Sequence, residues 1–265
     1  MKLAVQDNSF FGNRFEEKLT RIRSLGFEGL EVNGEDLIER FDEIKRAVRF
    51  TGVPISSVCG GYRGWIGDFN QERRKQAIHD ISEIMTRAGE IGATGVVVPA
   101  AYGMFSKRLP PFTPPRSEEE DKEVLLESLT KIEQSAQQAG TLLLLEPLNR
   151  YEDHMLNRLS DAAALIAEGG FSAVKIIADF FHMNIEESNI PESIHRAKDL
   201  IYHVHLADSH RYQPGTAHLD FVSGIRALKE IGFDRYMALE CRIIGDPADA
   251  YPQTVHYLRS CIDQA

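Results

Sequence analysis

The stretch TLLLLEPLNRYE, from Thr141 to Glu152, opens with a continuous apolar run and changes to polar residues at Glu146. A run of this kind, without polar alternation, is typical of a parallel strand that has helices outside it and packed side chains inside a barrel. Glu146 therefore stands at the carboxyl end of a predicted strand. Similar runs that end in polar residues follow in VKIIAD (174–179), IYHVHLAD (201–208) and YMALE (236–240).

Apolar runs recur along the whole chain, and the segments between them hold at least 20 residues, enough for one crossover helix. Strand–helix units that close at eight predict a single (β/α)8 TIM barrel of the α/β class. The 265 residues fit the roughly 250 residues typical of this fold, so we expect one domain over residues 1–265. The predicted strands are Lys2 to Val5, Gly29 to Val32, Val53 to Val58, Thr94 to Pro99, Thr141 to Leu145, Val174 to Ala178, Ile201 to Ala207 and Tyr236 to Leu239.

Charge and cysteine content limit the classes of function. The 40 acidic residues outnumber the 30 basic ones and give a formal net charge of −10, which disfavours nucleic acid as a partner. The three cysteines form no closely spaced pair, which favours a reducing cytoplasm. No apolar stretch approaches the 20 or so residues of a membrane span. We expect a cytoplasmic protein with no membrane partner.

Helix boundaries are visible in the segments between the strands. Ser117 begins a capping-box pattern, and Ser160 is predicted to cap a helix that stops at Gly169 and Gly170. The segment 104–117 is rich in prolines and basic residues and predicts a long loop on the active face. A passive surface excursion is the alternative for that loop.

The last four predicted strands end in residues that can bind metal. Barrel enzymes carry their catalytic groups at the carboxyl ends of strands, where this chain has Glu146, Asp179, His205 and Glu240. Adjacent strands lie about 4.8 Å apart, so these side chains can point at one centre. Each one alone could be a cap or an ion-pair partner. Together, three carboxylates and an imidazole predict one divalent ion, Mn2+ or Mg2+ with Co2+ tolerated, in preference to zinc.

Two histidines of the seventh predicted strand lie two residues apart. His203 and His205 must therefore face the same side, while Val204 and Leu206 face the helices. His205 lies nearer the catalytic end and is the predicted ligand. His203 is predicted to be a buried, hydrogen-bonded residue behind it.

Such a metal site defines a class of reaction. The ion has room for a substrate carbonyl and the neighbouring hydroxyl, and it makes the adjacent C–H acidic. Glu146 and Glu240 end the two outermost of the four strands and can flank a sugar from opposite sides, which favours them as the acid and base. Proton removal and return through a metal-stabilised enediolate gives an epimer. Transfer between neighbouring carbons would instead give an aldose–ketose isomer, and this alternative stays open.

Four segments carry a resemblance to a known family. EPLNRYE (146–152), ADFFHMN (178–184), HVHLADSHRYQPGTAHLDF (203–221) and ALEC (238–241) resemble the D-tagatose 3-epimerase and D-psicose (D-allulose) 3-epimerase family, in the xylose-isomerase-like sugar isomerase/epimerase superfamily. The resemblance implies a xylose-isomerase-like barrel that acts as a ketose 3-epimerase with Mn2+ or Co2+. It also implies that the four strand-end residues are ligands and that the two glutamates move the proton at C3.

By the same resemblance, Glu152, His182 and Arg211 are implied to bind the sugar substrate. Each has a simpler alternative: Glu152 could pair with Arg150, His182 could orient Asp179, and Arg211 could anchor its own loop. The resemblance further implies a homodimer or homotetramer.

Three aromatic residues lie near the ends of early predicted strands. Phe10, Trp65 and Tyr102 are candidates for an apolar wall beside the sugar. Packing in the core is the alternative for each of them.

Related activities remain open. An epimerase of keto-sugar acids would need a cation for the carboxylate, and Arg63, Lys107 and Arg108 are candidates in rim loops. A hydroxypyruvate-isomerase-like aldose–ketose isomerase is the other close alternative. A DNA-repair enzyme of the endonuclease IV type is disfavoured, because VCGG (58–61) and VVPA (97–100) lack the histidines of a zinc cluster. A sugar-binding barrel without catalysis is disfavoured because both glutamates are present.

Overall fold

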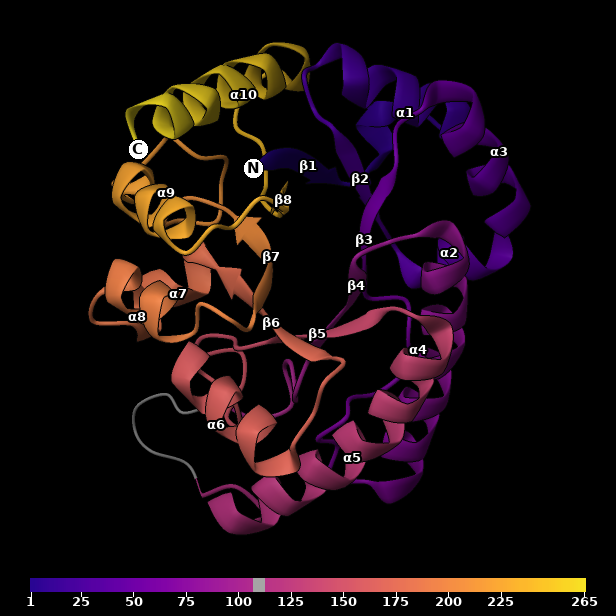
Figure 1. The fold of residues 1–265 in the computed structure, drawn as a ribbon, viewed down its shortest axis with the longest axis vertical. Coiled ribbons are helices and arrows are strands. Elements are labelled where there is room, and N and C mark those ends of the chain that lie inside the picture. The colour runs from indigo at the N-terminus through magenta and orange to yellow at the C-terminus, as the bar shows by residue number, and fades with distance from the viewer. Residues whose placement is uncertain (107–112) are drawn as a thin grey trace.

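A computed structural model describes residues 1–106 and 113–265. Eight parallel strands pair in sequence order and close into a barrel, with β1 next to β8 (Figure 1). Each predicted strand is present, with ends within two residues of the prediction, so the TIM-barrel prediction is confirmed. The strands are β1 Lys2–Gln6, β2 Gly29–Val32, β3 Ile55–Cys59, β4 Gly95–Pro99, β5 Leu142–Glu146, β6 Val174–Asp179, β7 Ile201–Leu206 and β8 Tyr236–Leu239.

Helices surround the barrel on its outside (Figure 1). No helix in the described part of the chain is both long enough and apolar enough to cross a membrane. The helices are η1 Ser9–Phe11, α1 Phe15–Ser24, α2 Gly34–Glu39, α3 Phe41–Thr51, α4 Gln71–Ile91, α5 Glu118–Ala139, α6 Leu159–Gly169, α7 Phe180–Glu186, α8 Ile190–Arg196, α9 Phe221–Glu230 and α10 Pro247–Gln264.

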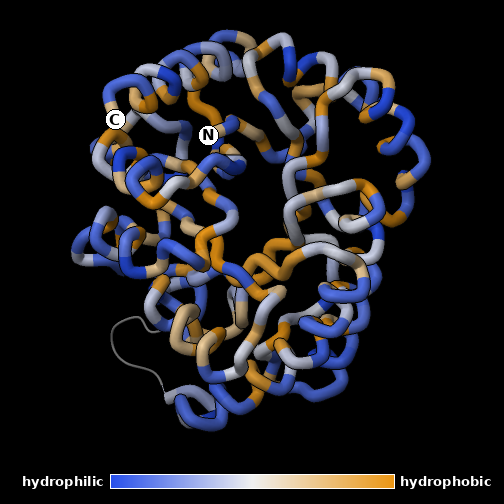
Figure 2. The backbone as a smooth tube through the Cα atoms, in the orientation of Figure 1, coloured by the Kyte–Doolittle hydropathy of each residue, from blue (hydrophilic) through white to orange (hydrophobic). Residues whose placement is uncertain are grey.

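Strand residues alternate between the helices and the barrel interior. Leu143 and Leu145 belong to the large core cluster that joins strands to helices, whereas Leu144 belongs to a small separate cluster with residues of β4 and β6. Hydrophobic colour follows the central strands in Figure 2, and hydrophilic colour dominates the outer helix turns. Because side chains alternate along a strand, Glu146 faces the interior with Leu144.

Two helix starts test the predicted caps. The Ser117 hydroxyl accepts the Glu120 N–H (3.2 Å), and the Glu120 carboxylate accepts the Ser117 N–H (2.7 Å), so the predicted capping box is confirmed. The prediction for Ser160 is wrong, because α6 begins before it. There the Asp161 carboxylate, a stronger acceptor than a hydroxyl, takes the N–H of Arg158 (3.0 Å).

The predicted loop 104–117 lies only partly within the described residues. Its flanks, 104–106 and 113–117, contain no helix or strand and connect β4 with α5. Lys107 and Arg108, two of the candidate cations, lie outside the described residues.

Candidate active site

Four side chains meet at the carboxyl ends of β5 to β8. Glu146 and Asp179 are the last residues of β5 and β6, His205 is the next to last of β7, and Glu240 directly follows β8. One ligand-type atom from each lies within 4.8 Å of the others. Three of the residues are buried, and the Glu240 side chain is 19% exposed. The four residues predicted from the strand ends therefore lie together.

His205 Nδ1 stands among the three carboxylates. It lies 3.0 Å from Glu146 Oε1, 3.3 Å from Glu240 Oε2 and 3.8 Å from Asp179 Oδ2. Three acidic side chains packed this closely require a positive charge between them. Because the donors are carboxylate oxygens and one imidazole nitrogen, the residues fit a hard divalent cation.

The chain directs Asp179 into the site through a helix cap. Its Oδ1 accepts the backbone N–H groups of Phe181 (2.7 Å) and His182 (3.2 Å) at the start of α7. An aspartate that ends a strand and opens a helix is well suited to this position. Its other oxygen, Oδ2, is left for the site.

Arg211 neutralises part of the acidic cluster. Its Nη1 donates to Asp179 Oδ2 (3.1 Å), and its Nη2 donates to Glu240 Oε2. The guanidinium also lies over the ring of Phe181, with 4.6 Å to the centroid. The second oxygen of Glu240 accepts from the amide of Gln6 (3.0 Å), the last residue of β1. Gln6 was not among the predicted site residues, although its position at a strand end was a signal.

Asp208 holds the loop that presents Arg211. The Asp208 carbonyl accepts the Arg211 N–H (2.9 Å), and Arg211 has a left-handed backbone with φ 66°. A non-glycine residue in this region is strained, and such strain is found where a side chain is held for function. The Asp208 carboxylate accepts five backbone N–H groups of the loop, those of Ser209, Gly215, Thr216, Ala217 and Leu219.

Burial and charge act differently on the groups of this cluster. Burial raises the pKa of Glu146 above its usual value, although the neighbouring His205 acts to lower it. Burial alone would also raise the pKa of Glu240, but the positive charges of His205 and Arg211 outweigh it and lower that pKa. Burial would lower the pKa of His205, but the charges of Glu31 and Glu240 raise it well above its usual value. The two glutamates therefore differ in their affinity for a proton.

The two other predicted sugar-binding residues lie beside this cluster. Asn149 links them, because its backbone N–H donates to His182 Nδ1 (3.1 Å) and its side-chain amide donates to Glu152 Oε1 (3.1 Å). Arg150 does not pair with Glu152; it pairs instead with Glu186 (2.9 Å). The alternative reading of Glu152 is therefore wrong. His182 Nε2 lies 3.6 Å from the Asp179 carboxylate, so an orienting role remains compatible with its position.

A cavity of about 510 Å³ opens above these residues. Glu146, Glu152, His182, Arg211 and Glu240 all line it. This volume is within the range of small-molecule sites.

The cavity wall includes aromatic side chains. Trp65 and Tyr102 both line it, with ring centroids 5.6 Å apart, as the apolar-wall reading expected. Phe10 does not line this cavity; the alternative for this residue, packing against the core, is confirmed. Its ring packs against Tyr251 (5.4 Å) and under the guanidinium of Arg21 (4.0 Å), because η1 turns it toward α1 and α10.

The profile of the family described as xylose isomerase-like TIM barrel matches residues 19–261. The chain belongs to this family. The match covers most of the chain, from α1 to α10, and agrees with the closed barrel and with the resemblance noted in the C-terminal half.

Several relatives of this xylose isomerase-like barrel are epimerases. This chain is 46% identical to the 3-dehydro-D-guloside 4-epimerase of Escherichia coli (strain K12) over 262 residues. These residues are 98% of this chain and all of the relative. The crystal structure of 3-keto-D-glucoside 4-epimerase from E. coli superposes with a TM-score of 0.96 at 46% identity, covering 98% of this chain and 100% of that one. The D-psicose 3-epimerase of Enterocloster bolteae is 33% identical over 138 residues, 52% of this chain and 46% of the relative.

Epimerases are isomerases, and these relatives act on carbohydrates. The chain is therefore a carbohydrate isomerase, a sugar epimerase of the xylose isomerase-like superfamily, with a candidate group for a divalent metal.

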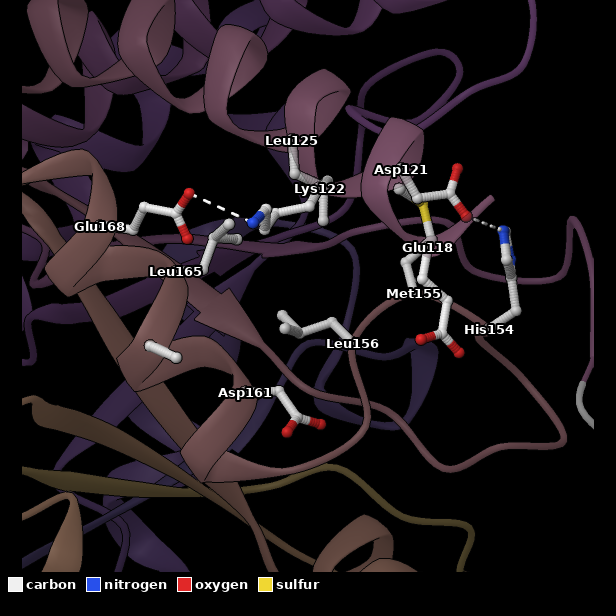
Figure 3. Close-up of a pocket in the computed structure, with 11 residues that line it drawn as sticks. Glu118, Asp121, Lys122, Leu125, His154, Met155, Leu156, Asp161, Leu165 and Glu168 are labelled. Carbon is white, nitrogen blue, oxygen red and sulfur yellow. Dashed lines mark ion pairs between the residues drawn. The ribbon is translucent and has the colours of Figure 1, made fainter. Parts of the chain in front are cut away.

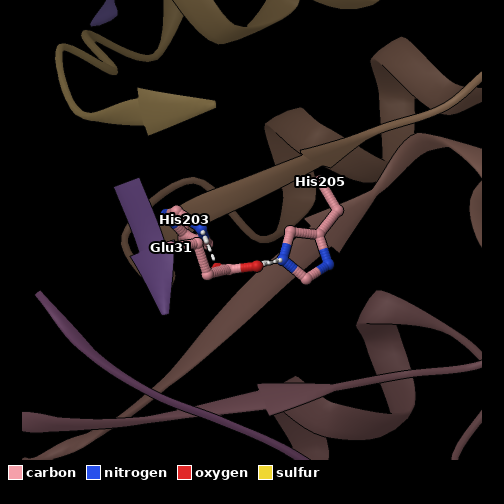
Figure 4. Close-up of side chains that lie close together, drawn as sticks. All are labelled: Glu31, His203 and His205. Carbon is pink, nitrogen blue, oxygen red and sulfur yellow. Dashed lines mark hydrogen bonds and ion pairs between the residues drawn. The ribbon is translucent and has the colours of Figure 1, made fainter. Parts of the chain in front are cut away.

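Behind the metal-type cluster, the barrel contains a residue that sequence analysis missed. Glu31 of β2 is 1% exposed and lies between His203 and His205 (Figure 4). His203 is buried and hydrogen-bonded, as predicted. A signal was present, because a glutamate inside the apolar run GLEV needs a buried partner.

Arg63, the one predicted rim cation that the structure describes, lies away from the cavity above Glu146. Arg63 binds the Asp80 carboxylate with Nε (2.8 Å) and Nη2 (2.9 Å), and it lines a different cavity from the one above Glu146. Arg242 does line the cavity above Glu146. The Arg242 guanidinium has no ion-pair partner among the residues that the structure describes.

A separate cavity of about 330 Å³ lies among α5, α6 and the segment 154–156 (Figure 3). Ion pairs border it, with Lys122 3.3 Å from Glu168 and His154 3.1 Å from Asp121. None of the predicted site residues lines this cavity, so it is distinct from the candidate active site.

Proposed function

We propose that this chain is a metal-dependent epimerase that inverts the hydroxyl-bearing carbon next to a ketone, with C4 of a 3-keto-glycoside as its reacting position. The observation that carries the proposal is that Glu146 and Glu240, from β5 and β8, both approach His205 Nδ1, at 3.0 and 3.3 Å. Two carboxylates at one centre can serve the two faces of a sugar carbon.

The two groups of related epimerases pose the same chemical problem. A ketose 3-epimerase acts on C3 beside a C2 ketone, and a 3-keto-glycoside 4-epimerase acts on C4 beside a C3 ketone. The names 3-dehydro-D-guloside and 3-keto-D-glucoside describe compounds that differ in configuration at C4 alone, so they are the two sides of one equilibrium. The proposed residues can therefore serve either reaction.

Glu146, Asp179, His205 and Glu240 would hold the ion, with Mn2+ the proposed metal and Co2+ or Mg2+ as substitutes. A divalent ion bound there would polarise the ketone and acidify the neighbouring C–H. This is the chemistry that the carboxylates alone do not supply.

Proton transfer is the proposed task of Glu146 and Glu240. One carboxylate removes the proton from the carbon next to the ketone, and the other returns a proton to the opposite face. Arg211, which already donates to Asp179 and Glu240, would donate to the oxygen on which negative charge develops. Glu152 and His182 would bind hydroxyls and hold the ring in place.

Similarity over the full length favours the 3-keto-glycoside substrate. The 4-epimerase relative matches 98% of the chain at 46% identity, whereas the D-psicose 3-epimerase matches 52% at 33%. Trp65 and Tyr102 give the cavity an apolar side, which suits the C–H face of a pyranose ring. An epimerase of free ketoses at C3 is the second candidate, favoured by the 33% identity to a D-psicose 3-epimerase over 138 residues.

The test is a substrate panel with Mn2+-loaded protein in deuterated water. The panel contains a methyl 3-keto-glucoside, free ketoses, keto-sugar acids and hydroxypyruvate. The proposal expects inversion at C4 of the 3-keto-glucoside, with one deuterium incorporated at C4. Inversion of a free ketose at C3 alone would favour the second candidate, and exchange at C1 or C2 would favour an aldose–ketose isomerase.

A dimer or tetramer and a cytoplasmic location remain predictions. Light scattering coupled to size-exclusion chromatography tests the assembly, and fractionation of the source cells tests the location.

A further inference from the structure

A buried hydrogen-bond network lies directly behind the proposed metal ligands. Glu31 Oε1 accepts from Nε2 of His205 (2.9 Å), while Glu31 Oε2 accepts from Nε2 of His203 (3.0 Å) and from the Ser57 hydroxyl (2.6 Å). The side chains of Glu31, His203 and His205 are all 0% exposed. Figure 4 shows Glu31 with the two histidines, and the Ser57 hydroxyl adds β3, so one carboxylate connects β2, β3 and β7.

The direction of these hydrogen bonds determines which nitrogen of His205 carries hydrogen. A carboxylate only accepts, so Nε2 of His205 must be the N–H that donates to Glu31. In the neutral imidazole that a metal ion requires, the lone pair is then on Nδ1. This is the atom that faces Glu146, Asp179 and Glu240.

We infer that Glu31 is a positioning residue that holds the ring and tautomer of His205 so that Nδ1 points at the metal centre, and that His203 and Ser57 hold Glu31 in turn. The inference rests on the metal site of the proposed function. Histidine ligands commonly donate their second N–H to a carboxylate, and loss of that carboxylate weakens metal binding.

The same three residues could instead be read as a second metal site, because atoms of Glu31, His203 and His205 also lie within 4.8 Å of one another. The hydrogen bonds argue against this reading. Both Nε2 atoms point at one carboxylate that already accepts from Ser57, so protons rather than a cation occupy the space between them.

The first experiment measures Mn2+ binding directly, by equilibrium dialysis or by electron paramagnetic resonance of free Mn2+. Glu31→Gln keeps the shape of the side chain and removes its charge. We expect one Mn2+ per wild-type chain and a loss of affinity of about 10- to 100-fold in the variant. A stoichiometry of two in the wild type, or unchanged affinity in Glu31→Gln, would overturn the inference.

Glu133→Gln is the matched control. Glu133 is also a buried carboxylate, 8% exposed, and it accepts from Ser172 and Ala173 far from the cluster. We expect this variant to lose stability and keep its Mn2+ affinity. An equal loss of affinity in both variants would mean that general destabilisation explains the result.

The second experiment needs no variant. Nitrogen-15 NMR of histidine-labelled wild-type protein with diamagnetic Mg2+ bound reports which nitrogen of His205 carries hydrogen. Hydrogen on Nε2 is expected, and a neutral imidazole with hydrogen on Nδ1 would overturn the inference.

The binding measurements distinguish the two ways in which the scheme can fail. If the wild type binds no metal at all, the proposed function fails. If the protein binds metal equally with and without Glu31, only the role of Glu31 fails.

Discussion

Nη1 of Arg211 donates a hydrogen bond to Oδ2 of Asp179 over 3.1 Å, and the same guanidinium reaches Glu240. A fixed positive charge therefore stands beside the proposed metal ligands. It offsets part of their negative charge and lines the cavity above them.

Arg211→Ala is expected to lower kcat/KM by roughly 100-fold, the scale found when one charge-stabilising donor is removed. Mn2+ affinity should stay the same or rise, because a competing cation is lost. Steady-state kinetics and equilibrium dialysis measure the two effects. Arg226→Ala, an exposed arginine of α9, is the control and should change neither. Unchanged kcat/KM in Arg211→Ala would remove this residue from the mechanism.

Glu146→Gln and Glu240→Gln should each reduce epimerisation by about 100-fold or more, because each removes one member of the proposed acid–base pair. Solvent deuterium uptake by each epimer separately measures the effect, with the metal content of each variant determined in parallel. The exposed Glu35→Gln serves as control. Normal turnover in either site variant at full metal occupancy contradicts the two-carboxylate scheme.

Asp208→Asn should destabilise the fold by about 1–3 kcal/mol, because an amide cannot accept all the N–H groups that now converge on the carboxylate. It should also lower kcat/KM, since the loop that presents Arg211 loses its anchor. Urea unfolding and kinetics separate these effects. The control is Asn70→Ala, which removes the cap of α4 and should cost about 1 kcal/mol with activity retained. Full activity of Asp208→Asn would show that the loop needs no such anchor.

Metal removal should lower the melting temperature. Binding of Mn2+ at 100 times its Kd is expected to add about 2.7 kcal/mol to the free energy of unfolding, because the ion binds the folded state alone. Asp179→Asn keeps a good cap for α7 and removes one charge from the cluster. Calorimetry with and without chelator should show a much smaller metal effect in this variant. An equal effect in both proteins places the ion elsewhere.

Acid should remove the stabilisation of the fold that one ion pair, away from the site, provides. The hydrogen bonds from Arg63 hold the pKa of Asp80 at about 2, below its usual value of 3.8. A carboxylate with a lowered pKa stabilises the fold above its unfolded pKa, and this stabilisation is lost as the pH falls through the folded value. Asp80→Asn should therefore lower the urea midpoint at pH 7, and the difference should shrink between about pH 4 and pH 2. A constant difference over this range would contradict the assignment.

The strands and the four strand-end residues could be predicted because they depend on local patterns. An apolar run marks each strand, and alternation places Glu146 two residues after the inward-facing Leu144. The order of the strands then brings β5 to β8 side by side. No contact between distant segments needs to be known for this step.

Gln6, Glu31 and Asp208 could not be assigned roles in this way, because their partners are fixed by closure of the barrel or by the path of a loop. Gln6 reaches Glu240 only because β1 pairs with β8. The choice for Phe10 between the cavity wall and the core stayed open for the same reason, since its neighbours in α1 and α10 are set by the tertiary fold. A buried charge in an apolar strand, as at Glu31, is a signal that a partner exists but does not identify it.

The pairing of Glu31 with His205 spans 174 positions of the chain. A fragment that contained only β5 to β8 would carry all four proposed ligands and still lack the carboxylate that orients one of them. Circular permutation, which rejoins the same segments in another order, would preserve that carboxylate. A chimeric barrel that joins one half of this chain to the other half of a relative would therefore keep His205 oriented only if a carboxylate stands at the position of Glu31.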